Sequence, residues 1–195
     1  MQVPAQERKF GETAPELCEL IARCQQGDYD AFAQLFAAHK DRIYSIALRF
    51  SGDPTAALDI AQDTFLKLLG QIQNFRGDAR FETWLYRVVV NACLDHRRAR
   101  RRWLPLIEDL VDRVRTGLGL EISAEQSQLR HRVRGAIAHL PADQRIAVVL
   151  RYTEGLSYEE IAEVTGVATG TVASRLNRAH RALDGRVQDY KGASR

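Results

Sequence analysis

Apolar positions recur every three or four residues along most of this chain, which is the period of an amphipathic helix. One such run, from 32 to 50, ends at the helix breaker Ser51-Gly52-Asp53-Pro54. Asp53 is predicted to cap the next helix, with Pro54 at its first position. The buried stripe of that helix is predicted to comprise Leu58, Ala61, Phe65, Leu68 and Ile72. Because no stretch alternates as a strand would, the pattern predicts an all-α fold.

Two helical domains are predicted, separated by a linker. A helix that begins near Phe81 should stop near Pro105, and scattered glycines then interrupt the periodicity. Helical spacing resumes at Ser123, which forms a capping-box pattern with Gln126. The predicted parts are an arm over 1–15, a first domain over 16–103, a flexible linker over 104–122, a second domain over 123–188 and a tail over 189–195.

The second domain contains a helix-turn-helix pattern between 156 and 183. Ser157 and Glu160 form a second capping-box pattern, Gly166 supplies the turn, and Thr169 opens the last helix. That helix has an apolar stripe of Val172, Leu176, Ala179 and Leu183. Its other side carries Thr171, Ser174, Asn177, Arg178 and Arg181. Such hydroxyl, amide and guanidinium groups can bind base edges and phosphates in a major groove, whereas an ordinary basic surface helix is the alternative.

The helix from Phe81 carries two stripes. Leu85, Val88, Val89 and Ala92 are predicted to face the core, and Trp84, Arg87, Asn91, Asp95 and Arg98 form the second stripe. An aromatic, an amide and several guanidinium groups in a row can stack on and neutralise an unpaired nucleic-acid strand, and Phe75 and Arg76 can wall the pocket. The positive charges of five arginines between 97 and 102 repel one another unless phosphates neutralise them. The alternatives are that Trp84 is a core residue and that the arginines are a solvated helix end.

One face of the helix after Pro54 can dock a partner protein. Asp59, Gln62, Asp63 and Leu66 follow helical spacing there and make an acidic patch with an apolar neighbour. A solvated surface is an equal alternative.

Composition narrows the function classes. A chain of 195 residues with 45% hydrophobic and 27% charged residues is typical of a globular protein. Because its net charge is only +3, nucleic-acid binding would depend on where the positive charges lie on the surface. Three cysteines without metal-ligand spacing and the absence of a signal-peptide pattern favour the cytoplasm without membrane insertion. The five histidines are scattered, and Asp59 with Asp63 has no matching pair elsewhere, so neither catalysis, a cofactor nor a metal site is expected.

Three segments together resemble the extracytoplasmic-function group of bacterial RNA polymerase sigma factors, of the sigma-E type. They are DIAQDTFLKLL from Asp59, NFRGDARFETWLYRVVVNACLDHRRARRR from Asn74, and LPADQRIAVVLRYTEGLSYEEIAEVTGVATGTVASRLNRAHRAL from Leu140. The resemblance spans about 17–100 and 123–188. It implies a transcription initiation factor with sigma domains 2 and 4, which bind core RNA polymerase, at the beta-prime clamp helices and beta flap, and promoter DNA. An anti-sigma partner is a further expectation from the resemblance.

The resemblance also implies roles for individual positions. The positions expected to dock on the polymerase clamp are Asp59, Gln62, Asp63 and Leu66. The positions expected to contact the single-stranded minus-ten element are Phe75, Arg76, Trp84, Arg87, Asn91, Arg97, Arg98 and Arg101. The positions expected to contact the minus-thirty-five duplex are Thr171, Ser174, Arg175, Arg178 and Arg181. Members of the group often carry Lys or Arg at the position of Ala173, so this chain departs from the pattern there and its preferred element can differ.

Two other functions remain open from the residues alone. The chain can be a stand-alone helix-turn-helix regulator whose first domain senses a signal or dimerises, which tight operator binding without polymerase would favour. A weaker hypothesis makes the first domain a helical enzyme with a DNA-binding tail.

Overall fold

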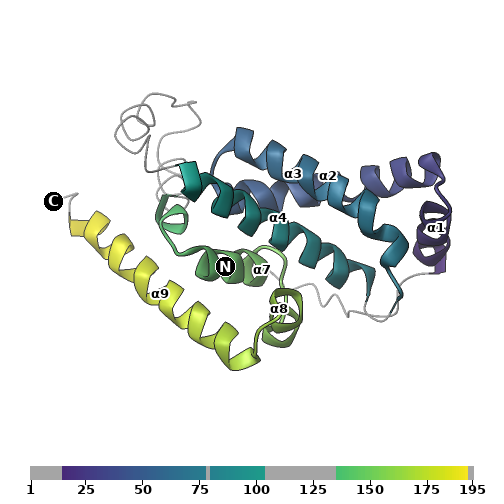
Figure 1. The fold of residues 1–195 in the computed structure, drawn as a ribbon. Helices are drawn as coiled ribbons and strands as arrows, with labels where there is room; N and C mark the ends of the chain where they lie inside the picture. Colours follow the sequence, from purple (N-terminus) through teal and green to yellow (C-terminus); the bar gives the residue numbers. More distant parts are fainter. Residues whose placement is uncertain (1–14, 78–79, 104–134, 193–195) are drawn as a thin grey trace.

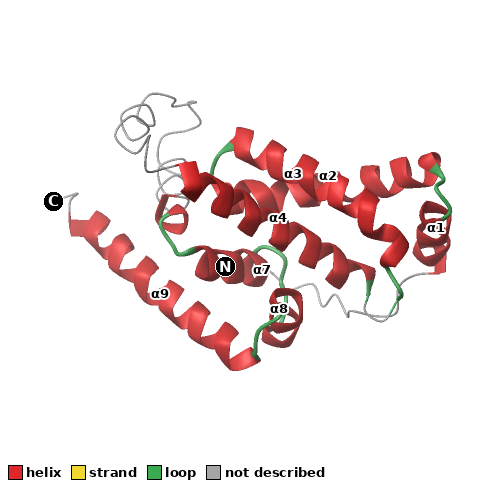
Figure 2. Cartoon of the chain, in the orientation of Figure 1, coloured by secondary structure: helices red, strands yellow, loops and turns green. Residues whose placement is uncertain are grey.

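The computed structural model describes residues 15–77, 80–103 and 135–192, with side chains described as far as 100 and 184 in the last two ranges. Every regular element in those ranges is a helix, so the all-α prediction is confirmed for them (Figure 2). The predicted linker over 104–122 and the capping box of Ser123 and Gln126 lie outside the described residues, as do nearly all of the arm and the end of the tail.

The N-terminal domain is a bundle of four α-helices with one short 3-10 turn. Its elements are α1 (Pro15–Gln25), α2 (Tyr29–Ser51), α3 (Pro54–Gln71), η1 (Ile72–Asn74) and α4 (Phe81–Trp103). The predicted break between α2 and α3 is confirmed: Gly52 ends α2 in the left-handed conformation with φ 74°, and the Asp53 side chain accepts a hydrogen bond from the Thr55 amide. Local capping chemistry therefore fixes the reversal between α2 and α3.

The buried face of α3 differs in part from the predicted one: Ala61, Leu68 and Ile72 are buried as predicted. Leu58, predicted to be buried, is 54% exposed, and Phe65 is only half-buried. The residues that pack inward are Ala57, Ile60, Ala61, Thr64 and Leu68. At 100° per residue this face is rotated by about 60° from the predicted stripe. α3 packs against α2 and α4 partly through small residues and through Thr64, whose hydroxyl donates a hydrogen bond to the Ile60 carbonyl oxygen. The hydrophobicity of the sequence alone therefore indicated the wrong centre for the buried face.

The C-terminal domain carries the helix-turn-helix. A helical turn at 135–138 precedes α7 (Ala142–Tyr152), α8 (Tyr158–Thr165) and α9 (Thr169–Gly192). The second predicted capping box is confirmed, because Ser157 Oγ accepts from the Glu160 amide at 3.1 Å and the Glu160 carboxylate accepts from the Ser157 amide at 2.7 Å. Gly166 ends α8 with φ 68°, which places α9 across α8 as the sequence predicts.

The two domains pack against each other. Helices α7 and α8 lie against α4, α7 also contacts α2, and α9 runs along the outer side of α7 and α8 (Figure 1). One continuous buried cluster joins the two domains, from Leu35 and Phe81 to Leu150 and Leu156. Among the described helices none is long and apolar enough to cross a membrane.

Candidate nucleic-acid and polymerase interfaces

The loop before α4 presents an aromatic cluster. Phe75 contacts Phe81 edge-on, with ring centroids 5.7 Å apart, and Trp84 at 5.3 Å. Phe81 is fully buried, whereas Phe75 and Trp84 are half-buried and pack against the core. The alternative that Trp84 is a core residue therefore holds for part of its side chain, and its remaining surface stays open beside Phe75.

A residue that the sequence did not single out holds this loop. The side-chain amide of Gln25, at the end of α1, donates hydrogen bonds to the carbonyl oxygens of Ile72 at 3.0 Å and Phe75 at 2.8 Å. Gly77 follows with φ 77°, a conformation that few residues other than glycine adopt. The position of Phe75 therefore depends on α1. A lone glutamine at a helix end gives no sequence signal for such a contact.

The second stripe of α4 is exposed at Asn91, Asp95 and Arg98 and half-buried at Trp84 and Arg87, and its members differ in their contacts. Asn91 is exposed on α4, and Arg76 is exposed in the loop before it. Arg87 donates to the carbonyl and carboxylate oxygens of Glu163 in α8, and Arg97 donates to the Leu140 carbonyl oxygen at 3.3 Å. Arg101 belongs to α4, but its side chain lies outside the described part.

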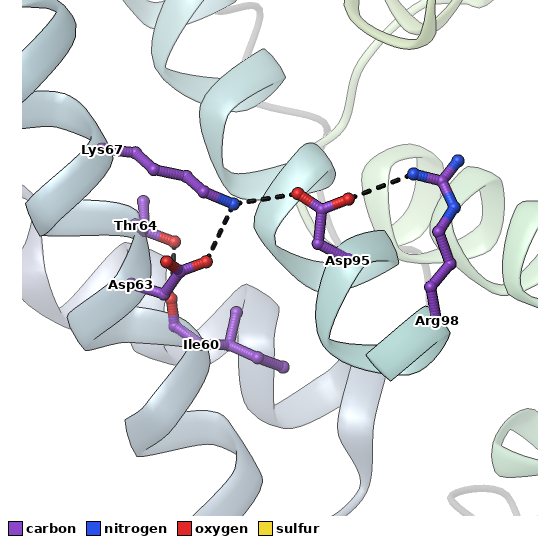
Figure 3. A network of polar contacts seen from close by, with 6 residues as sticks. All are labelled: Ile60, Asp63, Thr64, Lys67, Asp95 and Arg98. Atoms are coloured by element: carbon purple, nitrogen blue, oxygen red, sulfur yellow. Dashed lines mark hydrogen bonds and ion pairs between the residues drawn. The ribbon is translucent and has the colours of Figure 1, made fainter. Parts of the chain in front are cut away.

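An ionic network ties α3 to α4 (Figure 3). Lys67 Nζ lies 2.9 Å from both the Asp63 and the Asp95 carboxylates, and Arg98 lies 3.1 Å from the other oxygen of Asp95. The hydrogen bond from Lys67 is the largest cause that lowers the pKa of Asp95. The network therefore connects the acidic patch of α3 to the basic end of α4 and keeps Asp95 ionised.

The acidic patch on α3 is exposed. Asp59, Gln62 and Leu66 all face solvent, and Leu66 is 69% exposed. Leu58 and Leu69 are exposed as well, so this face of α3 is more apolar than predicted. A surface of leucines edged by carboxylates is suited to a protein partner that is apolar at its centre and basic at its rim.

The outer face of α9 is largely confirmed as exposed. Val172, Leu176 and Ala179 are buried and Leu183 partly so, while Ser174, Asn177, Arg178 and Arg181 are exposed and Thr171 is half-exposed. Arg178 donates to both the carbonyl and the hydroxyl oxygen of Ser174, which aligns the guanidinium along the helix surface. Arg175 differs, because it lies 3.2 Å from the Asp143 carboxylate of α7 and its side chain is only 19% exposed.

Potential metal ligands are dispersed over the described residues. No group of three or more His, Cys, Asp or Glu side chains among them is placed to hold a metal ion. Burial raises the pKa of Cys93 to about 12, so this thiol stays protonated at neutral pH.

Comparisons with known proteins agree with this geometry. Residues 35–103 match the family model described as Sigma-70 region 2, and residues 130–183 match the one described as Sigma-70, region 4. The RNA polymerase sigma-H factor of Pseudomonas aeruginosa is 37% identical over 179 residues, covering 87% of this chain and 93% of that protein. The ECF RNA polymerase sigma-E factor of Escherichia coli K12 is 37% identical over 182 residues, with the same coverage.

Two solved structures resemble the whole arrangement. CnrH in complex with the cytosolic domain of CnrY matches with a TM-score of 0.63 and 26% identity, covering 88% of this chain and 96% of that one. The sigma factor RpoE in complex with the anti-sigma factor NepR, from Bartonella quintana, matches with a TM-score of 0.64 and 25% identity, covering 80% of this chain and 96% of that one.

Proposed function

This chain belongs to the sigma-70 family of RNA polymerase sigma factors, and we propose that its two domains recognise two promoter elements in different physical states. It acts in transcription initiation by directing RNA polymerase to promoters. The N-terminal domain would bind the melted minus-ten strand, and the C-terminal domain would bind the minus-thirty-five duplex. Two observations carry this division. One domain has an exposed amide, Asn91, two helical turns along the same stripe of α4 from the half-buried ring of Trp84, and the other has an exposed helix-turn-helix face.

The proposed strand-binding surface consists of Phe75 and Arg76 in the loop before α4 and of Trp84 and Asn91 on α4. A base pulled from its stack costs a few kcal/mol, which stacking and hydrogen bonds in a pocket can offset. The Asn91 side chain can pair with a base edge, and the arginines at the end of α4 can neutralise phosphates. The half-buried packing of Phe75 against Trp84 would keep this pocket formed before the strand arrives.

The proposed duplex-binding surface consists of Thr171, Ser174, Arg178 and Arg181 on α9. Ser174, Arg178 and Arg181 are exposed and Thr171 is half-exposed, in the first half of a helix that follows a tight turn, which is the position of a recognition helix in the major groove. Arg175 is tied to Asp143, so it would reach DNA only by exchanging that carboxylate for a phosphate. Arg178 is therefore the strongest candidate for a base contact.

The proposed polymerase-binding face is the exposed patch of Asp59, Gln62, Asp63 and Leu66, extended by Leu58 and Leu69. The two added leucines follow from the rotation of α3. We place the clamp helices of the beta-prime subunit here. The polymerase would supply all of the chemistry, and the sigma factor would need neither a catalytic group nor a cofactor. We propose that it acts in the cytoplasm, where it would meet the polymerase.

A regulatory partner is part of the proposal. Both solved structures contain a second protein bound to the matching chain, and the second protein of the sigma factor RpoE is named an anti-sigma factor. By similarity, we propose that an anti-sigma protein holds this chain away from polymerase.

The test is reconstituted transcription on a genomic template library with core polymerase and the purified chain. We expect new start sites that depend on the chain and share two upstream elements. Core polymerase without the chain is the control. Transcripts that are the same with and without the chain would overturn the proposal, and tight operator binding without polymerase would instead support a stand-alone regulator.

A further inference from the structure

Two neighbouring arginines of α9 have different surroundings. Arg178 is exposed, whereas the side chain of Arg175 is only 19% exposed. Because each residue of an α-helix turns by about 100°, position 175 lies about 60° around the helix from position 178, on the side nearer the buried Val172 and Ala179. Arg175 therefore lies at the border between the proposed duplex-binding surface and the core, and its long side chain can turn to either side.

A carboxylate of α7 determines which side Arg175 takes. Asp143 Oδ2 lies 3.2 Å from Arg175 Nη2, and the Asp143 side chain is 57% exposed. Asp143 belongs to the first turn of α7, where the positive end of the helix dipole favours a carboxylate. Helices α7 and α9 pack against each other, so the ion pair lies across their contact and turns the Arg175 guanidinium toward α7.

Arg178 is oriented by its own helix instead. Its Nε donates to the Ser174 carbonyl oxygen and its Nη2 to the Ser174 hydroxyl oxygen, both at 3.2 Å. The Ser174 hydroxyl in turn donates to the Thr171 carbonyl oxygen at 2.9 Å. Since a hydroxyl has one hydrogen to donate, Ser174 has none left for DNA in this arrangement, and its role is to position Arg178. The other N–H groups of Arg178 stay available to a base edge.

The partners of the two arginines have opposite consequences for DNA binding. An arginine that reaches the phosphate backbone adds affinity that does not depend on the base sequence. An arginine paired with a carboxylate adds less of this affinity, because a phosphate has to displace the carboxylate and is repelled by its charge. Arg178 is thus held on the exposed face, while Arg175 is held back from it.

We propose that Asp143 withholds Arg175 from DNA phosphates and thereby limits sequence-independent binding by the C-terminal domain. Asp143 acts on DNA through Arg175, so it is a positioning residue. The inference rests on the proposed function, because it concerns how the helix-turn-helix separates a promoter from other duplex DNA. It gives α7, which lies behind the recognition helix, a part in that separation.

The salt dependence of duplex binding by the reconstituted holoenzyme tests the proposal. The probes are an upstream duplex with the minus-thirty-five element found by transcription and a duplex with that element scrambled. We expect Asp143→Asn to bind the scrambled duplex more tightly than the wild type at low salt. One added phosphate contact steepens the slope of log affinity against log salt by about 0.9, so this advantage should shrink about three- to fourfold between 50 and 200 mM salt. Loss of a purely structural contact would not tighten binding.

Three further variants separate this effect from a general change of charge. Asp143→Glu keeps the carboxylate and should keep the wild-type slope. Asp184→Asn removes an exposed carboxylate of the same helix about 13 Å along the axis from Arg175, and should also stay close to the wild-type slope. In an Arg175→Gln background, Asp143→Asn should no longer steepen the slope, because the arginine that it would release is absent.

The outcomes distinguish this inference from the proposed function. A wild-type slope in Asp143→Asn, or an equal steepening in the Arg175→Gln background, would overturn the inference. Weaker binding of the minus-thirty-five duplex by Asp143→Asn would also overturn it, because the carboxylate would then present Arg175 to DNA. In each of these cases the wild-type holoenzyme still prefers the minus-thirty-five duplex, so the proposed function stands. A wild type without that preference would overturn the proposed function, and this inference with it.

Discussion

Gln25 and Phe75 are joined by a 2.8 Å hydrogen bond between a side-chain amide and a backbone carbonyl, across 50 residues of sequence. A second bond from the same amide, to the Ile72 carbonyl oxygen, ties the start of η1 to α1 as well. Since Phe75 lies at the edge of the proposed base pocket, α1 sets the pocket's shape without reaching DNA itself.

We therefore expect Gln25→Ala to weaken minus-ten strand binding. Each neutral hydrogen bond contributes about 0.5–1.5 kcal/mol, so the loss of two should lower affinity for a single-stranded minus-ten oligonucleotide by roughly tenfold. Discrimination against a substituted base at the flipped position should fall as well, which general destabilisation would not produce. Gln26→Ala, the exposed neighbour, is the control and should match the wild type. Unchanged base discrimination in Gln25→Ala would remove Gln25 from the pocket.

The local elements of this fold follow from the sequence because their causes are local. Asp53, Ser157 and Gly166 each act within four residues, and each is found in its predicted role. The stripes of α4 and α9 were also predictable, since burial there follows helical periodicity over many residues. The exposure of Asn91 and Arg178 was predictable for the same reason, because both lie opposite the buried stripe of their helix.

The remaining features depend on contacts between distant segments. The face that α3 buries depends on how closely α2 and α4 approach small residues such as Ala57 and Ala61, which hydrophobicity does not report. The bond between Glu154 and Arg42 spans 112 residues, so neither residue alone signals it. Arg87 and Arg175 look free in the sequence for the same reason, although carboxylates of other helices hold them.

Asn91→Ala tests the base contact in the strand-binding surface. The side chain is exposed, so its loss should leave folding and polymerase binding intact. We expect open-complex formation on duplex promoter DNA to fall about fivefold, the cost of one hydrogen bond near 1 kcal/mol. Permanganate reactivity of the melted thymines measures the opening, with Gln34→Ala, an exposed amide on α2, as the control. Equal opening by mutant and wild type would refute the role of Asn91.

Arg178→Ala tests the groove contact of the helix-turn-helix. Removing one good base contact should cost about 1 to 3 kcal/mol of affinity for the minus-thirty-five element and relax specificity at one position. Competition between promoters that differ only upstream measures this effect. Arg49→Ala is a matched control, since Arg49 also bonds a serine four residues earlier but lies on α2. A preference that stays the same in Arg178→Ala would place the contact elsewhere on α9.

Ser157→Ala tests the capping box on which the orientation of α8 depends. Loss of an N-cap side chain costs about 1 kcal/mol, and for a chain of this size the melting temperature should fall by about 2–4 °C. Calorimetry measures the shift. Ser45→Ala, within α2, is the control. It removes only the exposed hydrogen bond from Arg49, and alanine has the higher helix propensity there, so we expect no net destabilisation. An unchanged melting temperature in Ser157→Ala would show that the capping box does not contribute to stability.

The ion pair between Lys67 and Asp95 should make a small part of the stability depend on pH. The pKa of Asp95 is lowered in the folded chain, first by the hydrogen bond from Lys67, so the pair stabilises the fold above the ordinary aspartate pKa of about 3.9 and loses its effect as pH falls below it. Both side chains are partly exposed, which limits the contribution to about 0.2–1 kcal/mol. Asp95→Asn should therefore lower the urea midpoint at pH 7 and have a progressively smaller effect as the pH falls from about 4 toward 2.5. In a Lys67→Gln background the same substitution should lose most of its effect at pH 7, and a difference of equal size at both pH values would contradict the pairing.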